Sequence, residues 1–418
     1  MPTTSVRVKA WNKCIGLLEL INGKIYFEYT EENQLNFSPL KLKDMKSTYE
    51  FSHLSYQKAL PGLIYDYLPG IYGTAYMDMF FIKHNKEVPS TLDRLLFIGN
   101  NSLGVLSFEP REILYSKIDA TMNLKELYAS SKEALTGVGP IEMSTIVAIS
   151  NSAGGGARAK AIVGYNPQNN KIYIGHKKLP AGFIYAIIKF DEKNLSRSTL
   201  LEDEWIDSSV HNKTEYAYYK MAKLLEINIS NSYLTQSEDG FHFVTQRFDR
   251  DKEGKLLHMH SLAGLFHHNP AETTFGYENL FRAGRYLNIP FEDFIQIYKI
   301  LVFNLVFGNR DDHTRNFSFL MREDGTWRFA PAYDLTFSLN RSHQMLINYI
   351  NADVISKKQL VAFGIENGID DAKKIIENTI EVKEKYLRES LMKLETPSSW
   401  IEYLFDKSSK IHKNLKGE

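Results

Sequence analysis

Residues 308–320, GNRDDHTRNFSFL, separate two different patterns and decide how the chain folds around them. Before them, the apolar run FEDFIQIYKILVFNLVF at 291–307 predicts a buried helix that ends at Gly308. After them, FSFLMREDGTWRFAPAYD at 317–334 has two apolar runs around Gly325. This predicts a β-hairpin, because glycine accepts the positive φ of a tight turn. The loop between helix and hairpin has the pattern D-x-H-x-x-N.

The predicted hairpin brings polar side chains from distant positions together. Pairing outward from its turn places Asn316 opposite Ala332 or Tyr333, so Asp334 lies one or two positions from the partner of Asn316. Mg²⁺ accepts carboxylate and carboxamide oxygens while substrate phosphates and waters complete its coordination. Asp311 is placed to orient a hydroxyl group beside such an ion. Together the three residues supply the base, the metal-binding amide and the metal-binding acid of phosphoryl transfer. The competing interpretation is ordinary turn chemistry in a loop rich in Asp and Asn.

A glycine-rich segment, NSAGGGARAK at 151–160, lies between the strand-like runs TIVAIS and AIVGYN. Its main-chain N–H groups suit phosphates, with Lys160 close by as a positive charge. Three glycines also suit a flexible turn, and the spacing is neither a Walker loop nor GxGxxG. Lys189 ends the run YAIIK and is a candidate phosphate-binding lysine or a solvent-exposed strand end. Glu215, on the helix that follows, is its candidate ion-pair partner.

Composition favours a folded protein with several domains. The 418 residues are 43% apolar and 13% aromatic, enough to fill more than one core. Lys plus Arg and Asp plus Glu each number 50, so no overall charge favours nucleic acid or an anionic membrane. The single Cys14 excludes a disulfide framework within the chain. No run reaches the ~20 apolar residues of a membrane span and the start lacks a signal-peptide pattern, so we expect a cytoplasmic protein.

Several ordered motifs together resemble a known family. They are NSAGGGARAK (151–160), AIIKF (186–190), VTQRFDR (244–250), GNRDDHTRNFSFL (308–320) and FAPAYD (329–334). In these motifs and over nearly its whole length, the chain resembles the HipA-like toxin kinases of bacterial type II toxin–antitoxin modules. The resemblance implies an α+β, two-lobed protein-kinase-like fold. Its expected parts are an accessory α/β subdomain at 1–115, a β-rich ATP-binding lobe at 140–250 and a helical catalytic lobe at 251–418.

The resemblance also implies an ATP- and Mg²⁺-dependent serine/threonine protein kinase. Asp311 falls at the family's catalytic base, and Asn316 and Asp334 fall at its metal ligands. The hinge at Gln246 and Phe248 is expected to meet the adenine through main-chain groups. The implied nucleotide-binding residues are Gly155, Gly156, Ala157, Arg158, Ala159, Lys160, Lys189, Gln246, Arg247, Phe248, His313, Asn316, Tyr333 and Asp334.

Regulation and partners follow from the same resemblance. Family members are switched off by phosphorylation of a serine at the start of the glycine loop, and Ser150 and Ser152 are the candidates here. Added negative charge at a loop that holds ATP phosphates would repel them. The chain has one glycine more than the commoner GGARPK form of this loop. The implied partners are ATP, a protein substrate such as an aminoacyl-tRNA synthetase, and a small helix-turn-helix antitoxin through which DNA is bound only indirectly.

Other functions are compatible with parts of the pattern. The D-x-H-x-x-N loop also resembles phosphoinositide kinases and aminoglycoside phosphotransferases, so a small-molecule or lipid kinase is one alternative. A non-catalytic corepressor that binds the antitoxin is another, although a neutral chain is no strong DNA binder by itself. The histidines of HMH (258–260) and HH (267–268) lack cysteines or an HExxH spacing, which favours packing or surface roles over zinc binding.

Overall fold

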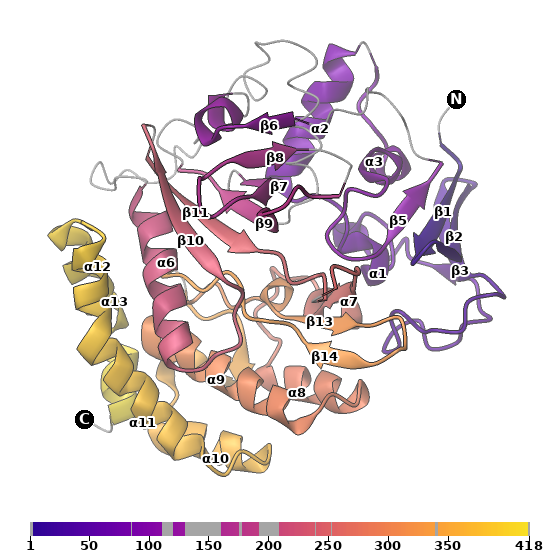
Figure 1. Ribbon diagram of the computed structural model, residues 1–418. Helices are drawn as coiled ribbons and strands as arrows, with labels where there is room; N and C mark the ends of the chain where they lie inside the picture. The colour runs from indigo at the N-terminus through magenta and orange to yellow at the C-terminus, as the bar shows by residue number, and fades with distance from the viewer. Residues whose placement is uncertain are drawn as a thin grey trace.

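The computed structural model describes residues 3–84, 86–110, 120–129, 160–174, 178–191, 209–238, 240–251, 253–338 and 342–416. Three bodies are visible: an N-terminal sheet with short helices, a second sheet flanked by one long helix, and a helical part below both (Figure 1). Ser150, Ser152 and the loop residues Gly155, Gly156, Ala157, Arg158 and Ala159 lie outside the described residues.

The N-terminal part is an antiparallel sheet with helices on one side. Its strand order is β4-β3-β2-β1-β5. In β1, every second side chain is buried, so one face of the sheet packs on the core. The strands are β1 (Ser5–Ala10), β2 (Lys13–Ile21), β3 (Lys24–Tyr29), β4 (Tyr49–Glu50) and β5 (Ser107–Glu109), and the helices are α1 (Gly62–Tyr65), α2 (Ile71–Lys83) and α3 (Thr91–Ile98).

The second sheet has the order β10-β11-β9-β7-β8-β6, and helix α6 (Ser209–Leu224) packs against β10 and β11. Strand β9 pairs with β7 so that Lys189 lies directly opposite Lys160. Because side chains alternate along a strand, Lys189 and Lys160 share one face of this sheet. The strands are β6 (Ala120–Met122), β7 (Lys160–Tyr165), β8 (Ile172–Ile174), β9 (Ile184–Lys189), β10 (Ser232–Ser237) and β11 (Gly240–Gln246).

The helical part is built around α9, which spans Phe291–Phe307. The predicted buried helix is therefore confirmed, including its end: Gly308 has φ 71° and its N–H donates to the main-chain oxygen of Asn304. Around α9 lie α7 (Leu262–Phe266), α8 (Tyr277–Tyr286), α10 (Lys357–Glu366), α11 (Ala372–Val382), α12 (Arg388–Lys393) and α13 (Ser398–Lys416). A small sheet of order β12-β13-β14 covers it, formed by β12 (His258–Ser261), β13 (Ser318–Met321) and β14 (Trp327–Phe329).

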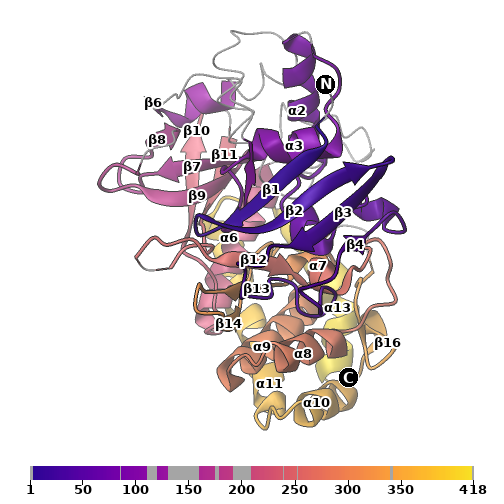
Figure 2. The same ribbon diagram turned by 90° about the vertical axis from the view of Figure 1, so that its right-hand side faces the viewer.

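The N-terminal part is joined to the helical part by a continuous core. One cluster of buried apolar side chains runs through both, whereas the second sheet has a cluster of its own. Helices α1 and α7 approach so closely that a Cβ on Gly62 would collide with the main chain of Gly264. Figure 2 shows the N-terminal strands lying directly above α7 and β12. Among the described residues, no helix is both long enough and apolar enough to cross a membrane.

Candidate active site

The predicted hairpin is present. Phe319 pairs with Phe329 and Met321 with Trp327, and the turn closes through Gly325, whose φ is 84°. The sequence predicted that strand pairing would continue as far as Asn316. In the structure, the pairing ends before that residue. Asn316 ends a 3₁₀ turn over Thr314–Asn316, and Ala332 leaves the hairpin to donate its N–H to the main-chain oxygen of Asn228 at 2.7 Å.

Asp312 anchors the loop from below, a role that the sequence did not reveal. Its side chain is buried and accepts from Tyr277 Oη at 3.0 Å and from the main-chain N–H of Gln344 at 2.7 Å. His343 Nδ1 lies 2.9 Å from its Oδ2. Asp311 and Asp312 are neighbours in sequence, and only the direction in which each side chain points separates them. The buried one fixes the loop, and the other is partly exposed to solvent.

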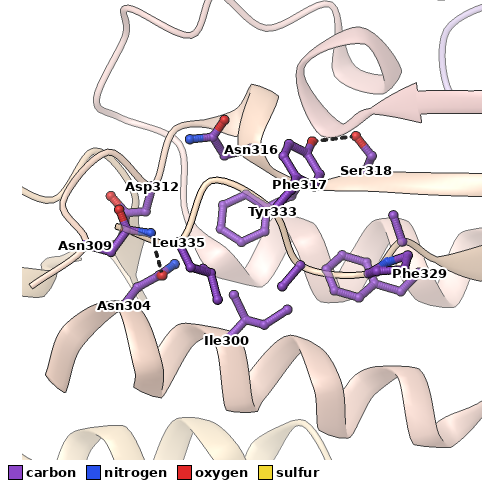
Figure 3. A pocket seen from close by; sticks show the side chains of 13 residues that line it. Ile300, Asn304, Asn309, Asp312, Asn316, Phe317, Ser318, Phe329, Tyr333 and Leu335 are labelled. Atoms are coloured by element: carbon purple, nitrogen blue, oxygen red, sulfur yellow. Dashed lines mark hydrogen bonds between the residues drawn. The ribbon is translucent and has the colours of Figure 1, made fainter. Parts of the chain in front are cut away.

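Buried amides link this loop to the end of the hairpin. Asn309 donates through Nδ2 to Asn304 Oδ1 on α9 at 2.9 Å and to the main-chain oxygen of Asp334 at 3.4 Å. Asn304 in turn donates to Tyr277 Oη at 3.1 Å. Figure 3 shows Asn304, Asn309 and Asp312 together at one end of a narrow cavity, with Tyr333 bonded to Ser318 at the other. The loop that contains Asn309 and the end of the hairpin at Asp334 are therefore both connected to α9.

The three residues of the D-x-H-x-x-N pattern lie together. Asn316 donates through Nδ2 to the main-chain oxygen of Asp311 at 2.7 Å. His313 Nε2 lies 3.9 Å from Asp311 Oδ1. The side chains of Asp311 and His313 are 37% and 25% exposed, so solvent or a substrate can reach them.

A row of charges links the second sheet to the hairpin. Lys189 Nζ on β9 lies 2.5 Å from Glu215 Oε1 on α6 and also contacts Asp334 Oδ1. The predicted Lys189–Glu215 ion pair is confirmed, and the alternative of a solvent-exposed lysine is wrong because Lys189 is buried. Burial alone would raise the pKa of Asp334, but the ammonium groups of Lys189 and Lys160 hold that pKa well below its usual value. Asp334 is therefore a carboxylate at neutral pH.

The expected hinge residues lie beside this row. The main-chain N–H groups of Gln246 and Arg247 already donate to the oxygens of Asn231 and Tyr185, each at 2.9 Å. The Arg247 side chain is committed as well, since its Nε lies 2.9 Å from Asp249 Oδ1. The ring of Phe248 lies 5.5 Å from that of Tyr333 between centroids. These two rings form an apolar wall next to the hinge.

The side chains present fit a magnesium ion. With Nδ2 of Asn316 committed to a carbonyl, its Oδ1 is the atom left to face a cation, and Asp334 supplies an ionised carboxylate. Hard oxygen donors of this kind suit Mg²⁺, which takes the rest of its shell from water and phosphates. Among the described residues, no group of three or more His, Cys, Asp or Glu side chains is placed to hold a metal by itself. His258 and His260 instead hydrogen-bond to protein groups of the N-terminal part.

Comparison with known sequences decides the family. The profile of the HipA-like C-terminal domain matches residues 152–386, more than half of the chain. The chain belongs to the HipA-like C-terminal domain family. That match includes Lys189, Asp311, Asn316 and Asp334, so every element of the charged row and of the D-x-H-x-x-N loop lies inside it.

Two similar proteins extend this result. HipA from the Shewanella oneidensis MR-1 complex of HipA, HipB and operator DNA has the same fold, with a TM-score of 0.66 and 16% identity, over 98% of this chain and 96% of that one. A putative kinase of Haemophilus influenzae is 25% identical over 159 residues, which are 35% of this chain and 46% of that protein. The chain thus spans about half the length of that curated relative.

Proposed function

We propose that this HipA-like protein is an ATP- and Mg²⁺-dependent serine/threonine protein kinase. The observation that carries the proposal is the unbroken row Glu215–Lys189–Asp334, which ends beside the loop that holds Asp311 and Asn316. A buried lysine between two carboxylates is positioned to exchange one of these partners for an oxygen of a nucleotide phosphate. Phosphoryl transfer needs mainly such positioning and charge neutralisation.

The proposed reaction assigns one task to each group. Lys189 and Lys160 bind phosphate oxygens of ATP, and Asn316 and Asp334 hold the metal ion that neutralises the developing charge. Asp311 accepts the proton of the substrate hydroxyl while its oxygen forms a bond to the γ-phosphorus. The bond from that phosphorus to the bridging oxygen breaks, and ADP leaves with the electron pair. Phe248 and Tyr333 flank the adenine, whose polar edge faces the hinge.

The toxin role and the partners belong to the same proposal. The similar Shewanella protein was solved with HipB and operator DNA. We infer that this chain likewise binds a small antitoxin, contacts DNA only within that complex, and arrests growth by phosphorylating a protein such as an aminoacyl-tRNA synthetase. Phosphorylation of Ser150 or Ser152 is proposed to switch it off.

The test is to follow γ-labelled phosphate from ATP in a lysate. The purified protein is expected to label a small set of proteins on Ser or Thr, and Lys189→Met is expected to abolish this labelling. Lys171→Met, which alters an exposed lysine next to the same sheet, is the matched control and should label as the native protein does. Label found only in lipids or metabolites would support the alternative of a lipid or small-molecule kinase. Absence of transfer to any fraction would leave the corepressor alternative.

A further inference from the structure

The segment 342–345 hydrogen-bonds to both aspartates of the loop, Asp311 and Asp312. Gln344 donates through Nε2 to Asp311 Oδ1 at 2.8 Å, and its main-chain N–H donates to Asp312 Oδ1 at 2.7 Å. His343 Nδ1 lies 2.9 Å from the other oxygen of Asp312. Sequence motifs gave no indication of this segment, because His343 and Gln344 lie 31 to 33 positions after the aspartates that they contact.

Main-chain hydrogen bonds on both sides of Gln344 hold this segment in place. On one side, the N–H of His343 donates to Asp353 Oδ2 at 3.0 Å, and Arg310 Nε lies 3.2 Å from Asp353 Oδ1. On the other side, Leu346 N–H donates to the main-chain oxygen of Phe275 at 2.9 Å. Asp353 therefore connects the segment that carries Gln344 with the residue that precedes Asp311.

We propose that Gln344 is a positioning residue for phosphoryl transfer, which fixes the carboxylate of Asp311 through Oδ1 so that Oδ2 receives the proton of the substrate hydroxyl. An aspartate side chain rotates about two bonds, and a donor on one oxygen selects one orientation of the other. This inference rests on the proposed kinase function, since it refines the role of Asp311 within it.

The test uses two substitutions that keep the size of the side chain. Gln344→Met removes the donor, and Gln344→Glu places an oxygen opposite the carboxylate. Loss of one hydrogen bond to a charged group predicts that Gln344→Met lowers kcat about 10- to 100-fold while KM for ATP changes little. Gln344→Glu should lower kcat further, again with little change in KM for ATP, because an acceptor oxygen then faces Asp311 Oδ1 where the native protein has an N–H donor. Gln168→Met, at an exposed glutamine, is the control and should behave as the native protein does.

A second measurement does not depend on turnover. In a crystal structure of Gln344→Met, the carboxylate of Asp311 should be rotated from the orientation that it has in the native protein. An unchanged orientation of this carboxylate, or a Gln344→Met variant with native kcat, would overturn the positioning role. If the native protein transfers no phosphate at all, the proposed function fails. The comparison of the two crystal structures then still decides whether Gln344 controls the orientation of this carboxylate.

Discussion

Two clusters in this molecule contain the same kinds of side chain but differ in their hydrogen bonding and in their exposure to solvent. At the joint between the N-terminal part and β12, His260 lies with Nδ1 2.7 Å from Asp66 Oδ2 and Nε2 2.9 Å from Ser38 Oγ. On the loop after α9, Asp311 and His313 lie 3.9 Å apart. The joint has the connectivity of a hydrolase triad, whereas the loop has only a loose pair.

Access to solvent separates the two clusters. Ser38 and His260 are fully buried, so no substrate can reach the hydroxyl group, and Asp66 also accepts from the N–H and Oγ of Ser261. Asp311 keeps more than a third of its side chain exposed. Geometry among side chains is therefore not sufficient evidence of catalysis. The joint is a buried hydrogen-bonded connection, and the loop after α9 is where solvent reaches the side chains.

The largest effect should come from the loop after α9. Asp311→Asn removes the proposed base and should lower phosphoryl transfer by about 10²- to 10⁴-fold, with binding of Mg·ATP largely kept. Steady-state assays together with nucleotide titration measure both quantities. Asp370→Asn, on the exposed surface of the helical part, is the matched control. An Asp311→Asn enzyme with native turnover would remove the distinction between the clusters.

The joint should respond in stability and not in chemistry. Asp66→Ala leaves the buried His260 without its carboxylate partner, and breaking such a buried pair costs about 3–5 kcal/mol. Denaturant titration should show this loss, while the nucleotide affinity of the folded fraction remains near native. Ser38→Ala, which removes only the hydroxyl group, should cost about 1 kcal/mol. If Asp66→Ala left the free energy of unfolding unchanged, the joint would not be the connection described above.

Asp334→Asn should weaken the metal site more than it weakens the fold. The carboxylate loses its charge, so Lys189 loses one of its ionic partners. We expect Mg²⁺-dependent ATP affinity to fall about 10- to 100-fold, the range for losing a charged contact. Calorimetry with and without Mg²⁺ separates the metal contribution. Equal losses in both conditions would argue against Asp334 as a metal ligand.

The smallest effect concerns pH at the joint. Burial and the neighbouring His260 lower the pKa of His258 to about 3. The folded state therefore binds this proton less readily than the unfolded chain, whose histidine pKa is about 6.5. Stability is complete above that pH and is lost as pH falls from about 6.5 toward 3, by about 2 kcal/mol at pH 5. Unfolding curves at pH 7 and pH 5 measure this loss, and His258→Gln should reduce the difference. An unchanged difference would assign it to other groups.

The sequence predicted the parts that local pattern controls. The apolar run before Gly308 and the two runs around Gly325 gave the buried helix and the hairpin, because period and turn residues are local signals. Lys189 and Asp334 were candidates from local pattern and from the likeness to a family, and Glu215 was the candidate ion-pair partner of Lys189 on the following helix. The structure joins the three side chains directly.

Contacts between distant segments could not be predicted. In the sequence, nothing distinguishes Asp312 from its neighbour Asp311. Its burial depends on Tyr277 and His343, which lie some 30 residues away on either side. Gln344 has no motif around it, and its contact with Asp311 follows from packing of the chain after the hairpin. The bend that takes Ala332 toward Asn228 likewise depends on a segment from the second sheet.

The most direct measurement is a crystal structure of the protein with Mg²⁺ and a non-hydrolysable ATP analogue. We predict a metal ion at about 2.1 Å from Asn316 Oδ1 and from a carboxylate oxygen of Asp334, with Lys189 moved from Asp334 to a phosphate oxygen. The γ-phosphate should face Asp311. A nucleotide bound elsewhere, or a metal ion that does not touch Asn316 and Asp334, would contradict the account.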